Sequence, residues 1–356
     1  MHRSVNPEFW QGKRVLLTGH TGFKGSWLSL WLQKMGVALR GVALEPPTQP
    51  AMFDIAEVGQ EMEHHVTDIR DLAGMRRQVA DFDPDILIHM AAQPLVRLSY
   101  KEPVETYETN VMGTVNVLEA AKSGKALKAI VNVTTDKCYE NREWAWGYRE
   151  NEPMGGYDPY SSSKGCVELL SAAYRKSFLA EAGIAMATAR AGNVIGGGDW
   201  SVDRLLPDVL RSIEKGEPVE IRNPNAIRPW QHVLEPLSGY LVLAEHLHGE
   251  GGHGFAEGWN FGPADEDARS VEWIVRQMCD TWPDEASWTV QAGDHPHEAS
   301  LLKLDISKAR QRLGWVPRWN LESALARTMD WHRAWIDGKN MRDFSLQQID
   351  AYLTSN

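Results

Sequence analysis

The chain has 356 residues, of which 43% are hydrophobic, and a formal net charge of -11 at pH 7. This length allows a large core, in two domains or in one domain with a substantial lobe. Acids and bases are spread along the chain without a basic stripe, so nucleic-acid binding is not expected.

The three cysteines, Cys138, Cys166 and Cys279, are far apart and odd in number. This spacing supports neither a disulfide framework nor a zinc site. Residues 1–12 are polar and do not resemble a signal peptide. No run approaches the roughly 20 apolar residues that span a bilayer. We therefore expect a cytoplasmic protein without a membrane partner.

Short apolar runs alternate with helical periodicity through the first half of the chain. The predicted strands are 14–18, 37–44, 86–90, 129–134 and 185–190, and the predicted helices are 25–35, 72–82, 104–121 and 160–182. This alternation predicts an α/β fold with a doubly wound parallel sheet of Rossmann type. Ligands of such sheets bind at the carboxyl ends of the strands.

The pattern becomes irregular after Arg190, where glycines and prolines interrupt it. We expect a smaller C-terminal lobe that covers the ligand-binding edge. The predicted dinucleotide-binding domain is 1–190, with a return segment around 229–262. Segments 191–228 and 263–356 are assigned to a substrate-binding lobe.

A glycine turn follows the first predicted strand and opens the first helix. It consists of Gly19, Gly22 and Gly25, with Thr21, Phe23 and Lys24 between them. Glycine allows a tight turn and close approach to a pyrophosphate, while the helix N-terminus supplies free N–H groups. We expect these residues to bind a dinucleotide.

The end of the second strand carries Glu45, without a closely following arginine. A carboxylate can accept a hydrogen bond from a ribose 2′-hydroxyl and would repel a 2′-phosphate. NAD is therefore favoured over NADP. Arg40 and Lys24 keep the alternative open, and Glu45 is also compatible with an ordinary solvated loop position.

Tyr160 and Lys164 stand four residues apart, which places both on one face of a helix. A cationic lysine beside a tyrosine lowers the tyrosine pKa, and a phenolate can take a hydroxyl proton while hydride leaves the same carbon. Tyr157 is a second candidate for this base.

The order and spacing of several motifs resemble the extended short-chain dehydrogenases/reductases. These motifs are the glycine turn, Asp68-Ile69, His89-Met90-Ala91-Ala92-Gln93, Thr109-Asn110, Thr134-Thr135-Asp136 and Tyr160-Ser161-Ser162-Ser163-Lys164. The resemblance implies that Asp68 and Ile69 contact the adenine, that Ala91 and Gln93 line the cofactor, and that Asn110 supports it. It also implies a catalytic triad of Thr135, Tyr160 and Lys164.

Within this family, Thr135-Asp136-Lys137 resembles the sugar-nucleotide 4,6-dehydratases, which are NAD-dependent lyases of deoxysugar biosynthesis. The usual motif of these enzymes ends in glutamate. The motif with lysine in that place resembles that of the branch that acts on CDP-glucose. The resemblance implies that Asp136 protonates the departing C6 hydroxyl. Lys137 is a candidate for the C5 base only if its pKa is lowered.

The segment from Arg190 to Trp200 resembles the family's substrate-lobe motif, in which Asn193 would contact substrate phosphate or sugar. Arg204 and Arg228 are candidates for the pyrophosphate, because guanidinium groups match phosphate oxygens. A buried structural role is the alternative for either arginine. His295 and His297 lack an evident third ligand, so no metal is expected.

Two rival functions remain. A nucleotide-sugar 4-epimerase would share the cofactor residues without needing Asp136 and Lys137. A catalytically silent dinucleotide-binding protein could use the same fold. By the family pattern, helices 104–121 and 160–182 would form the contact of a homodimer, or of a tetramer built from such dimers.

Overall fold

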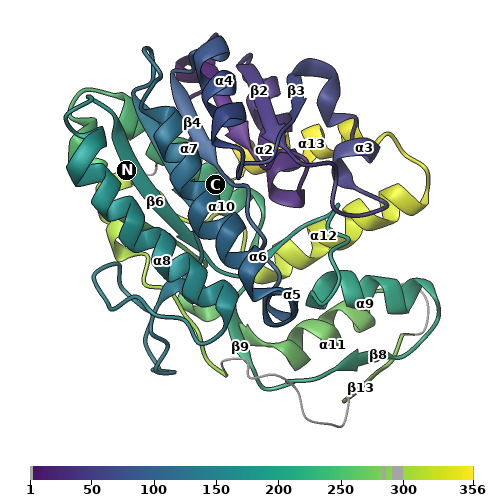
Figure 1. The fold of residues 1–356 in the computed structure, drawn as a ribbon. Helices are drawn as coiled ribbons and strands as arrows, with labels where there is room; N and C mark the ends of the chain where they lie inside the picture. The colour runs from purple at the N-terminus through teal and green to yellow at the C-terminus, as the bar shows by residue number, and fades with distance from the viewer. Residues whose placement is uncertain (1–2, 283–285, 291–299, 356) are drawn as a thin grey trace.

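A parallel sheet of seven strands forms the centre of the molecule (Figure 1). The structure is a computed structural model that describes residues 3–282, 286–290 and 300–355. The sheet order is β3-β2-β1-β4-β5-β6-β11. Its strands are β1 (Arg14–Thr18), β2 (Ala38–Ala43), β3 (Glu63–Val66), β4 (Ile86–His89), β5 (Ala129–Val133), β6 (Ala185–Ala191) and β11 (Gly258–Phe261). The order reverses between β1 and β4, which is the topological switch point where ligands of such sheets bind.

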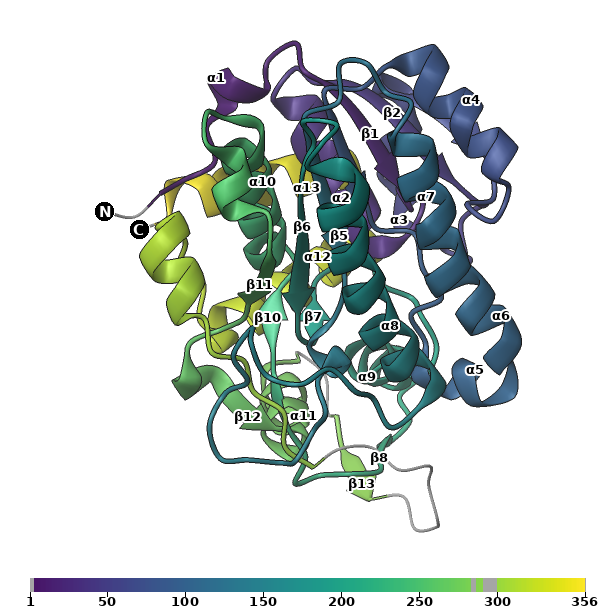
Figure 2. The same ribbon diagram turned by 60° about the vertical axis from the view of Figure 1, so that its left-hand side comes forward.

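Helices cover both faces of this sheet (Figure 2). One face carries α2 (Phe23–Lys34), α10 (Leu234–His248) and α13 (Met341–Thr354). The other carries α4 (Leu72–Phe82), α7 (Gly113–Ala121) and α8 (Pro159–Tyr174). Successive side chains of β1 pack against the two helical layers in turn. Val15 and Leu17 belong to one hydrophobic core, and Leu16 belongs to the other. The predicted Rossmann-type sheet is thereby confirmed.

Shorter elements connect these layers. They are α1 (Pro7–Trp10), α3 (Met52–Ile55), η1 (Val58–Glu61), α5 (Val96–Lys101), α6 (Pro103–Tyr107), η2 (Glu108–Met112), η3 (Asp136–Cys138), η4 (Arg175–Leu179), η5 (Gly252–Phe255), η6 (Asp265–Asp267) and η7 (Ala309–Leu313). Of these, η2, η4 and η7 are π-helical, and the others labelled η are 3₁₀ helices. The predicted helix 104–121 is thus continued from α6 into α7 through a π-helical turn.

A smaller lobe lies beyond the carboxyl edge of the sheet. Its elements are β7 (Val194–Ile195), α9 (Leu205–Glu214), β8 (Val219–Ile221), β9 (Ile227–Pro229), β10 (Gln231–His232), β12 (Ala268–Ser270), α11 (Val271–Thr281), β13 (Trp288–Val290) and α12 (Leu321–Ile336). The strands pair as β7 with β10, β8 with β13, and β9 with β12. Buried side chains of α9, α11 and α12 form a separate hydrophobic core.

The domain division predicted at residue 190 remains a proposal, and α13 suggests one refinement of it. Trp31 of α2 and Tyr352 of α13 pack edge to face with ring centroids 5.7 Å apart. Met341 and Ile349 are buried in the same core as β1. We therefore propose that Met341–Thr354 belongs with the dinucleotide-binding domain rather than with the lobe.

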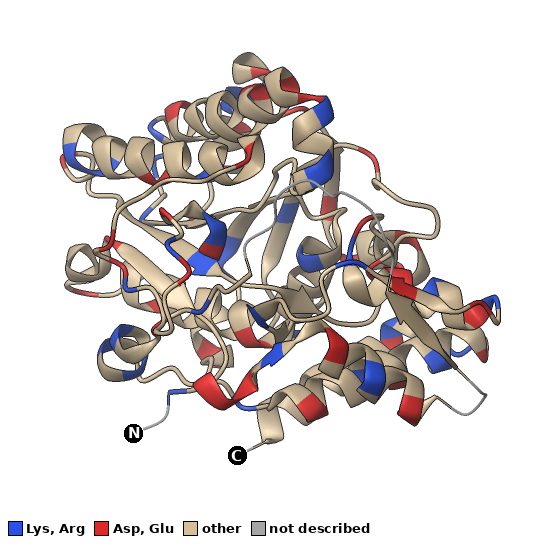
Figure 3. Ribbon diagram, turned by 90° about the horizontal axis from the view of Figure 1, so that it is seen from below, with Lys and Arg blue, Asp and Glu red and all other residues tan. Residues whose placement is uncertain are grey.

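Lysine and arginine positions are interspersed with aspartate and glutamate positions along the ribbon in Figure 3. Among the described residues, no helix has the length and apolar character needed to cross a membrane.

Candidate active site

The glycine turn after β1 requires glycine at two of its three positions. Gly19 has a φ of +80°, and a Cβ there would lie 2.7 Å from the backbone nitrogen of Ala91. A Cβ at Gly25 would lie 2.0 Å from the carbonyl oxygen of Gly19. Gly22 is the N-cap of α2 and has no side-chain cap. The first N–H groups of α2 are thus left for a ligand, which fits a pyrophosphate.

Asn110 joins the loop after β4 to the helix that carries Tyr160. Its side-chain oxygen accepts from the backbone N–H of Gln93 at 2.8 Å. Its amide nitrogen donates to the Gln93 carbonyl at 3.1 Å and to the Ser163 hydroxyl at 2.9 Å. Asn110 lies in η2, and π-helical turns are frequent at functional sites. The structure thus brings Ala91, Gln93 and Asn110 to one edge of the sheet.

Asp68 and Ile69 follow β3 on the other side of the switch point. The Asp68 carboxylate accepts from Arg70 at 2.7 Å. Ile69 is buried against Gly113, where a Cβ would lie 2.5 Å from the Ile69 Cδ1. The adenine contacts assigned to both residues remain predictions.

The two cations that could bind a 2′-phosphate are engaged elsewhere. The Arg40 Nε donates to Glu63 at 2.7 Å, and the Lys24 ammonium donates to the Tyr240 hydroxyl at 3.0 Å. Glu45 is exposed just beyond the end of β2. This end of the strand therefore offers a carboxylate, which suits a ribose hydroxyl better than a phosphate.

The structure places Tyr160 in the site and Tyr157 at the surface, with 8% and 77% of their areas exposed. A hydrogen bond with Thr135 lowers the Tyr160 pKa, but burial outweighs it and raises that pKa to about 12. The net lowering of the tyrosine pKa expected beside Lys164 is therefore not found, because burial dominates. The Lys164 ammonium instead donates to the Val133 carbonyl at 3.3 Å, and burial lowers the Lys164 pKa to about 8.

Asp136 presents a buried carboxyl beside this pair. One oxygen accepts from the Thr135 hydroxyl at 3.0 Å, and the other, Oδ2, has no hydrogen-bond partner among the described residues. Burial raises the Asp136 pKa, while the charges of Lys137 and Arg228 oppose this shift. Lys137 itself is only half-buried. Burial thus favours the protonated form of the Asp136 carboxyl, and its Oδ2 is available for a hydrogen bond to a ligand.

Glu168 is a buried acid that the sequence motifs did not identify. It forms an ion pair with Arg190 at 2.8 Å and accepts from the Thr188 hydroxyl at 2.7 Å. Its charge raises the Lys164 pKa, against the effect of burial. The spacing of four residues between Lys164 and Glu168 was the available signal.

Lys24 also lies closer to the catalytic residues than its place in the glycine turn suggests. Burial, together with the charges of Lys164 and Arg204, lowers its pKa to about 7. Its partner Tyr240 was missed because 216 positions separate the two residues in the sequence. No local pattern could have revealed this contact.

The two arginines proposed for the substrate lie at the catalytic end of the lobe. Arg204 is held by Asp199 at 2.9 Å, and the neighbouring Tyr160 hydroxyl contributes to its raised pKa. Arg228 is buried and its charge acts on Asp136. Asn193 is half-buried, and its carbonyl accepts from the Gln231 backbone at 3.0 Å.

His295 and His297 lie outside the described residues. Within the described ranges, no group of three or more histidine, cysteine, aspartate or glutamate side chains could hold a metal ion.

The chain matches the family model of GDP-mannose 4,6 dehydratase over residues 16–328. It is 59% identical to a CDP-glucose 4,6-dehydratase from Salmonella typhimurium, with 99% of each chain covered. A dTDP-glucose 4,6-dehydratase from Xanthomonas campestris is 26% identical, with 94% of this chain and 98% of the relative covered.

Solved structures show the same fold. The dTDP-glucose 4,6-dehydratase from Bacillus anthracis in complex with NAD has a TM-score of 0.74 at 20% identity, covering 90% of this chain and 97% of the other. A UDP-glucose-4-epimerase from Stenotrophomonas maltophila has a TM-score of 0.79 at 19% identity, covering 92% of this chain and 99% of the other. With the family model and the Salmonella relative, these findings show that the chain belongs to the sugar-nucleotide 4,6-dehydratases of the extended short-chain dehydrogenase/reductase family, in the branch of CDP-glucose 4,6-dehydratase.

Proposed function

We propose that this enzyme converts CDP-glucose to CDP-4-keto-6-deoxyglucose, with NAD as its cofactor. The observation that carries this proposal is the buried Asp136 carboxyl beside Thr135, with a raised pKa and a free Oδ2. Expulsion of the C6 hydroxyl needs a proton donor, and burial favours the protonated form of a carboxyl that can supply that proton. A 4-epimerase has no such step.

The glycine turn fits a dinucleotide for a steric reason. Side chains at Gly19 or Gly25 would overlap the backbone that shapes the cradle, and Gly22 leaves the N-terminus of α2 open. When bound, NAD would supply the acceptor for the C4 hydride and the donor of a hydride to C6. Glu45 and the engagement of Arg40 by Glu63 favour NAD over NADP.

In the oxidation half of the reaction, Tyr160 takes the proton of the C4 hydroxyl. Thr135 donates a hydrogen bond to the C4 oxygen and holds it near Tyr160. A Tyr160 pKa of about 12 means that the phenolate needs positive charge close by. Lys164 supplies such a charge below its pKa of about 8, and Glu168 helps to keep the lysine protonated.

In the elimination half, the C4 ketone acidifies the proton on C5. We assign Lys137 as the base that takes this proton, and the C5–H electron pair becomes the C5–C6 double bond. The C6 hydroxyl leaves as water with the proton that Asp136 donates. Asn193, Arg204 and Arg228 hold the diphosphate, and Asp199 fixes the Arg204 guanidinium.

Substrate labelled with deuterium at C4 tests the reaction type. The dehydratase should give a product with deuterium at C6 and a solvent proton at C5, as seen by NMR and mass spectrometry. Deuterium retained at C4, in a product that keeps its C6 hydroxyl, would instead identify a 4-epimerase. Binding of NAD without turnover of any nucleotide-diphosphate glucose would indicate a silent binding protein.

The nucleotide is tested separately by comparing CDP-, UDP-, dTDP- and GDP-glucose as substrates. We expect the highest kcat/KM with CDP-glucose. A higher value with another nucleotide would leave the reaction type intact and correct the base.

We further propose a homodimer formed by the helices on the α8 side of the sheet. Val104 is 69% exposed, Leu169 63% and Met112 52%, and Phe178 and Tyr107 extend this apolar surface. Burying such a surface against a second copy would remove it from water. Sedimentation should show that wild type is a dimer and that the charge introduced by Leu169→Glu dissociates it.

We also propose that the reaction takes place in the cytoplasm, where Cys138, Cys166 and Cys279 stay reduced.

A further inference from the structure

A single carboxylate bridges the two parts of the molecule at the edge of the lobe. Oδ1 of Asp203 lies 3.4 Å from Nη1 of Arg97 and 3.4 Å from Nη2 of Arg222. Arg97 belongs to α5, four residues after Gln93, and Arg222 directly follows β8 of the lobe. The Arg97–Asp203 ion pair links α5 to the segment just before α9. One arginine therefore comes from the cofactor domain and the other from the lobe.

This cluster is incompletely satisfied. Two guanidinium charges share one carboxylate oxygen, which leaves one excess positive charge in the group. The Nε of Arg97 is buried and has no hydrogen-bond partner in the part of the chain that the structure describes. Asp203 also holds a φ of +60°, in the left-handed region that few non-glycine residues adopt.

The cluster is nevertheless accessible. The side chains of Arg97, Asp203 and Arg222 are 25%, 34% and 29% exposed. An anion from solvent can therefore reach the guanidinium groups. A diphosphate carries more charge and more acceptor oxygens than one carboxylate, and guanidinium forks match phosphate oxygens in geometry.

The position also suits a nucleotide sugar. Asp203 is the chain neighbour of Arg204, whose guanidinium acts on the Tyr160 hydroxyl. In a nucleotide sugar, the diphosphate follows directly after the sugar. A sugar held at Tyr160 would thus extend its diphosphate past Arg204, toward this cluster.

We propose that Arg97 and Arg222 bind the diphosphate of the nucleotide sugar, and that Asp203 holds the two arginines together until the substrate replaces it. This inference rests on the proposed function for the class of substrate. It adds a residue of the cofactor domain to a diphosphate site otherwise built from the lobe. Binding would thereby connect the two parts through the ligand.

Calorimetric titration with CDP and with cytidine tests this inference without turnover. Arg97→Met should weaken CDP binding about 10-fold or more, the loss typical of a charged hydrogen-bonding group, and leave cytidine binding unchanged. Arg97→Lys should restore part of the loss, and Arg222→Met should repeat it. Arg276→Met is the matched control, because Arg276 forms a separate exposed ion pair with Glu272 at 2.7 Å.

Asp203→Asn distinguishes a temporary partner from a structural one. Asparagine also tolerates the left-handed backbone, so the fold should be retained. If the carboxylate competes with substrate, this variant should bind CDP about 2- to 5-fold more tightly, the range of an exposed ion pair. Weaker CDP binding by Asp203→Asn would overturn the competition between Asp203 and substrate.

Kinetics supply an independent reading. Arg97→Met should raise KM for the nucleotide sugar and change kcat less than 2-fold, because binding that is equal in ground and transition states acts on KM. Wild-type CDP affinity in both Arg97→Met and Arg222→Met would overturn the inference. Repeating the titrations with UDP and dTDP separates the two proposals. Tighter binding of another diphosphate, still lost in Arg97→Met, would correct the base and keep the arginine site.

Discussion

At the scale of single residues, Tyr160 shows how burial can oppose the chemistry that a motif implies. Its pKa of about 12 leaves the hydroxyl protonated at neutral pH, although Lys164 lies one helical turn away. The proton transfer therefore depends on positive charge close to the hydroxyl, which we assign to Lys164. Tyr160→Phe should reduce turnover by at least the ~10²-fold typical of a positioned base while NAD binding persists. Tyr157→Phe is the matched control and should turn over normally.

Asp136 allows a sharper test, because it acts on only one half of the reaction. Asp136→Asn keeps the shape of the side chain and removes the proton that the C6 hydroxyl needs. We expect oxidation at C4 to continue and elimination to slow, so that a 4-keto sugar with its C6 hydroxyl accumulates. Quenching with borodeuteride and mass analysis should detect it. If oxidation slows equally and no keto sugar builds up, Asp136 has another role.

At the scale of elements, the glycine turn at the start of α2 contains glycines with two different roles. Gly25 is needed for packing, and Gly22 leaves room for a ligand. A Cβ at Gly25 would lie 2.0 Å from the Gly19 carbonyl, whereas a Cβ at Gly22 would lie 3.5 Å from that oxygen, an ordinary contact. Gly25→Ala should therefore lower the melting temperature and NAD affinity together. Gly22→Ala should melt like wild type and lose NAD affinity alone, because the added methyl group would stand at the N-terminus of α2, where we propose that the pyrophosphate binds. Equal melting temperatures for both variants would contradict the packing role of Gly25.

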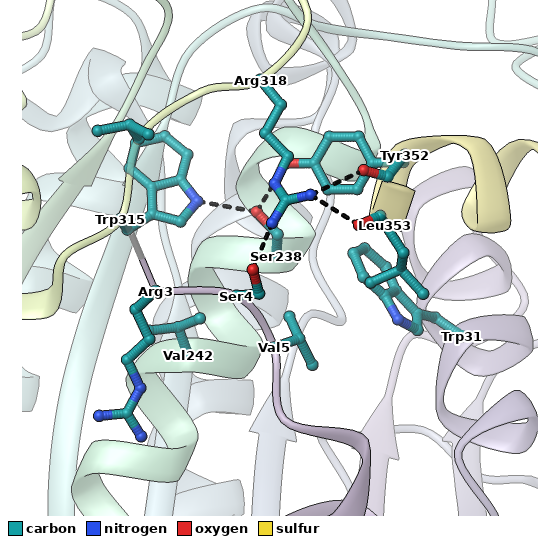
Figure 4. Close-up of a pocket in the computed structure, with 11 residues that line it drawn as sticks. Arg3, Ser4, Val5, Trp31, Ser238, Val242, Trp315, Arg318, Tyr352 and Leu353 are labelled. Atoms are coloured by element: carbon teal, nitrogen blue, oxygen red, sulfur yellow. Dashed lines mark hydrogen bonds between the residues drawn. The ribbon is translucent and has the colours of Figure 1, made fainter. Parts of the chain in front are cut away.

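At the scale of the whole molecule, a buried polar cluster joins α10 to the C-terminal part of the chain. Glu235 accepts from the Tyr352 hydroxyl and the Trp319 backbone, each at 2.7 Å. A cavity of about 10 Å³ lies near this cluster, with Arg318 donating to the carbonyls of Tyr352 and Leu353 (Figure 4). This cavity is distinct from the catalytic residues.

The cluster predicts a pH dependence of stability. Burial raises the Glu235 pKa from 4.5 to about 7, so the folded state holds a proton that the unfolded state releases. This contribution is complete below pH 4.5 and is lost as the pH rises through about 7. It amounts to at most about 3 kcal/mol. Urea unfolding at pH 5 and pH 8 should give the free energy of unfolding of wild type and of Glu235→Gln. Relative to wild type, the variant should be more stable at pH 8 than at pH 5. Glu8→Gln, at an exposed position, should show no such shift.

Local patterns predicted the parts of the molecule that local forces decide. Buried apolar runs marked β1, β4, β5 and β6, and the spacing of Tyr160 and Lys164 placed them on one helix. The strand β3 was not predicted, because Glu63–Val66 is a mostly exposed edge strand without an apolar run. The partners of Lys24 and Arg97 were also beyond prediction. These contacts join distant segments, and only the packed lobe brings them together.

The packing of α13 on α2 has a consequence for how the protein is made. Helix α2 is translated well before α13, which covers part of its surface. Domains generally fold as units during synthesis, with the N-terminal part first. Here the helix that begins at the glycine turn is fully packed only when α13, some 300 positions later in the chain, has been translated. The nascent chain therefore exposes an incomplete cofactor domain until α13 has been translated, because the surface of α2 that α13 covers stays open until then.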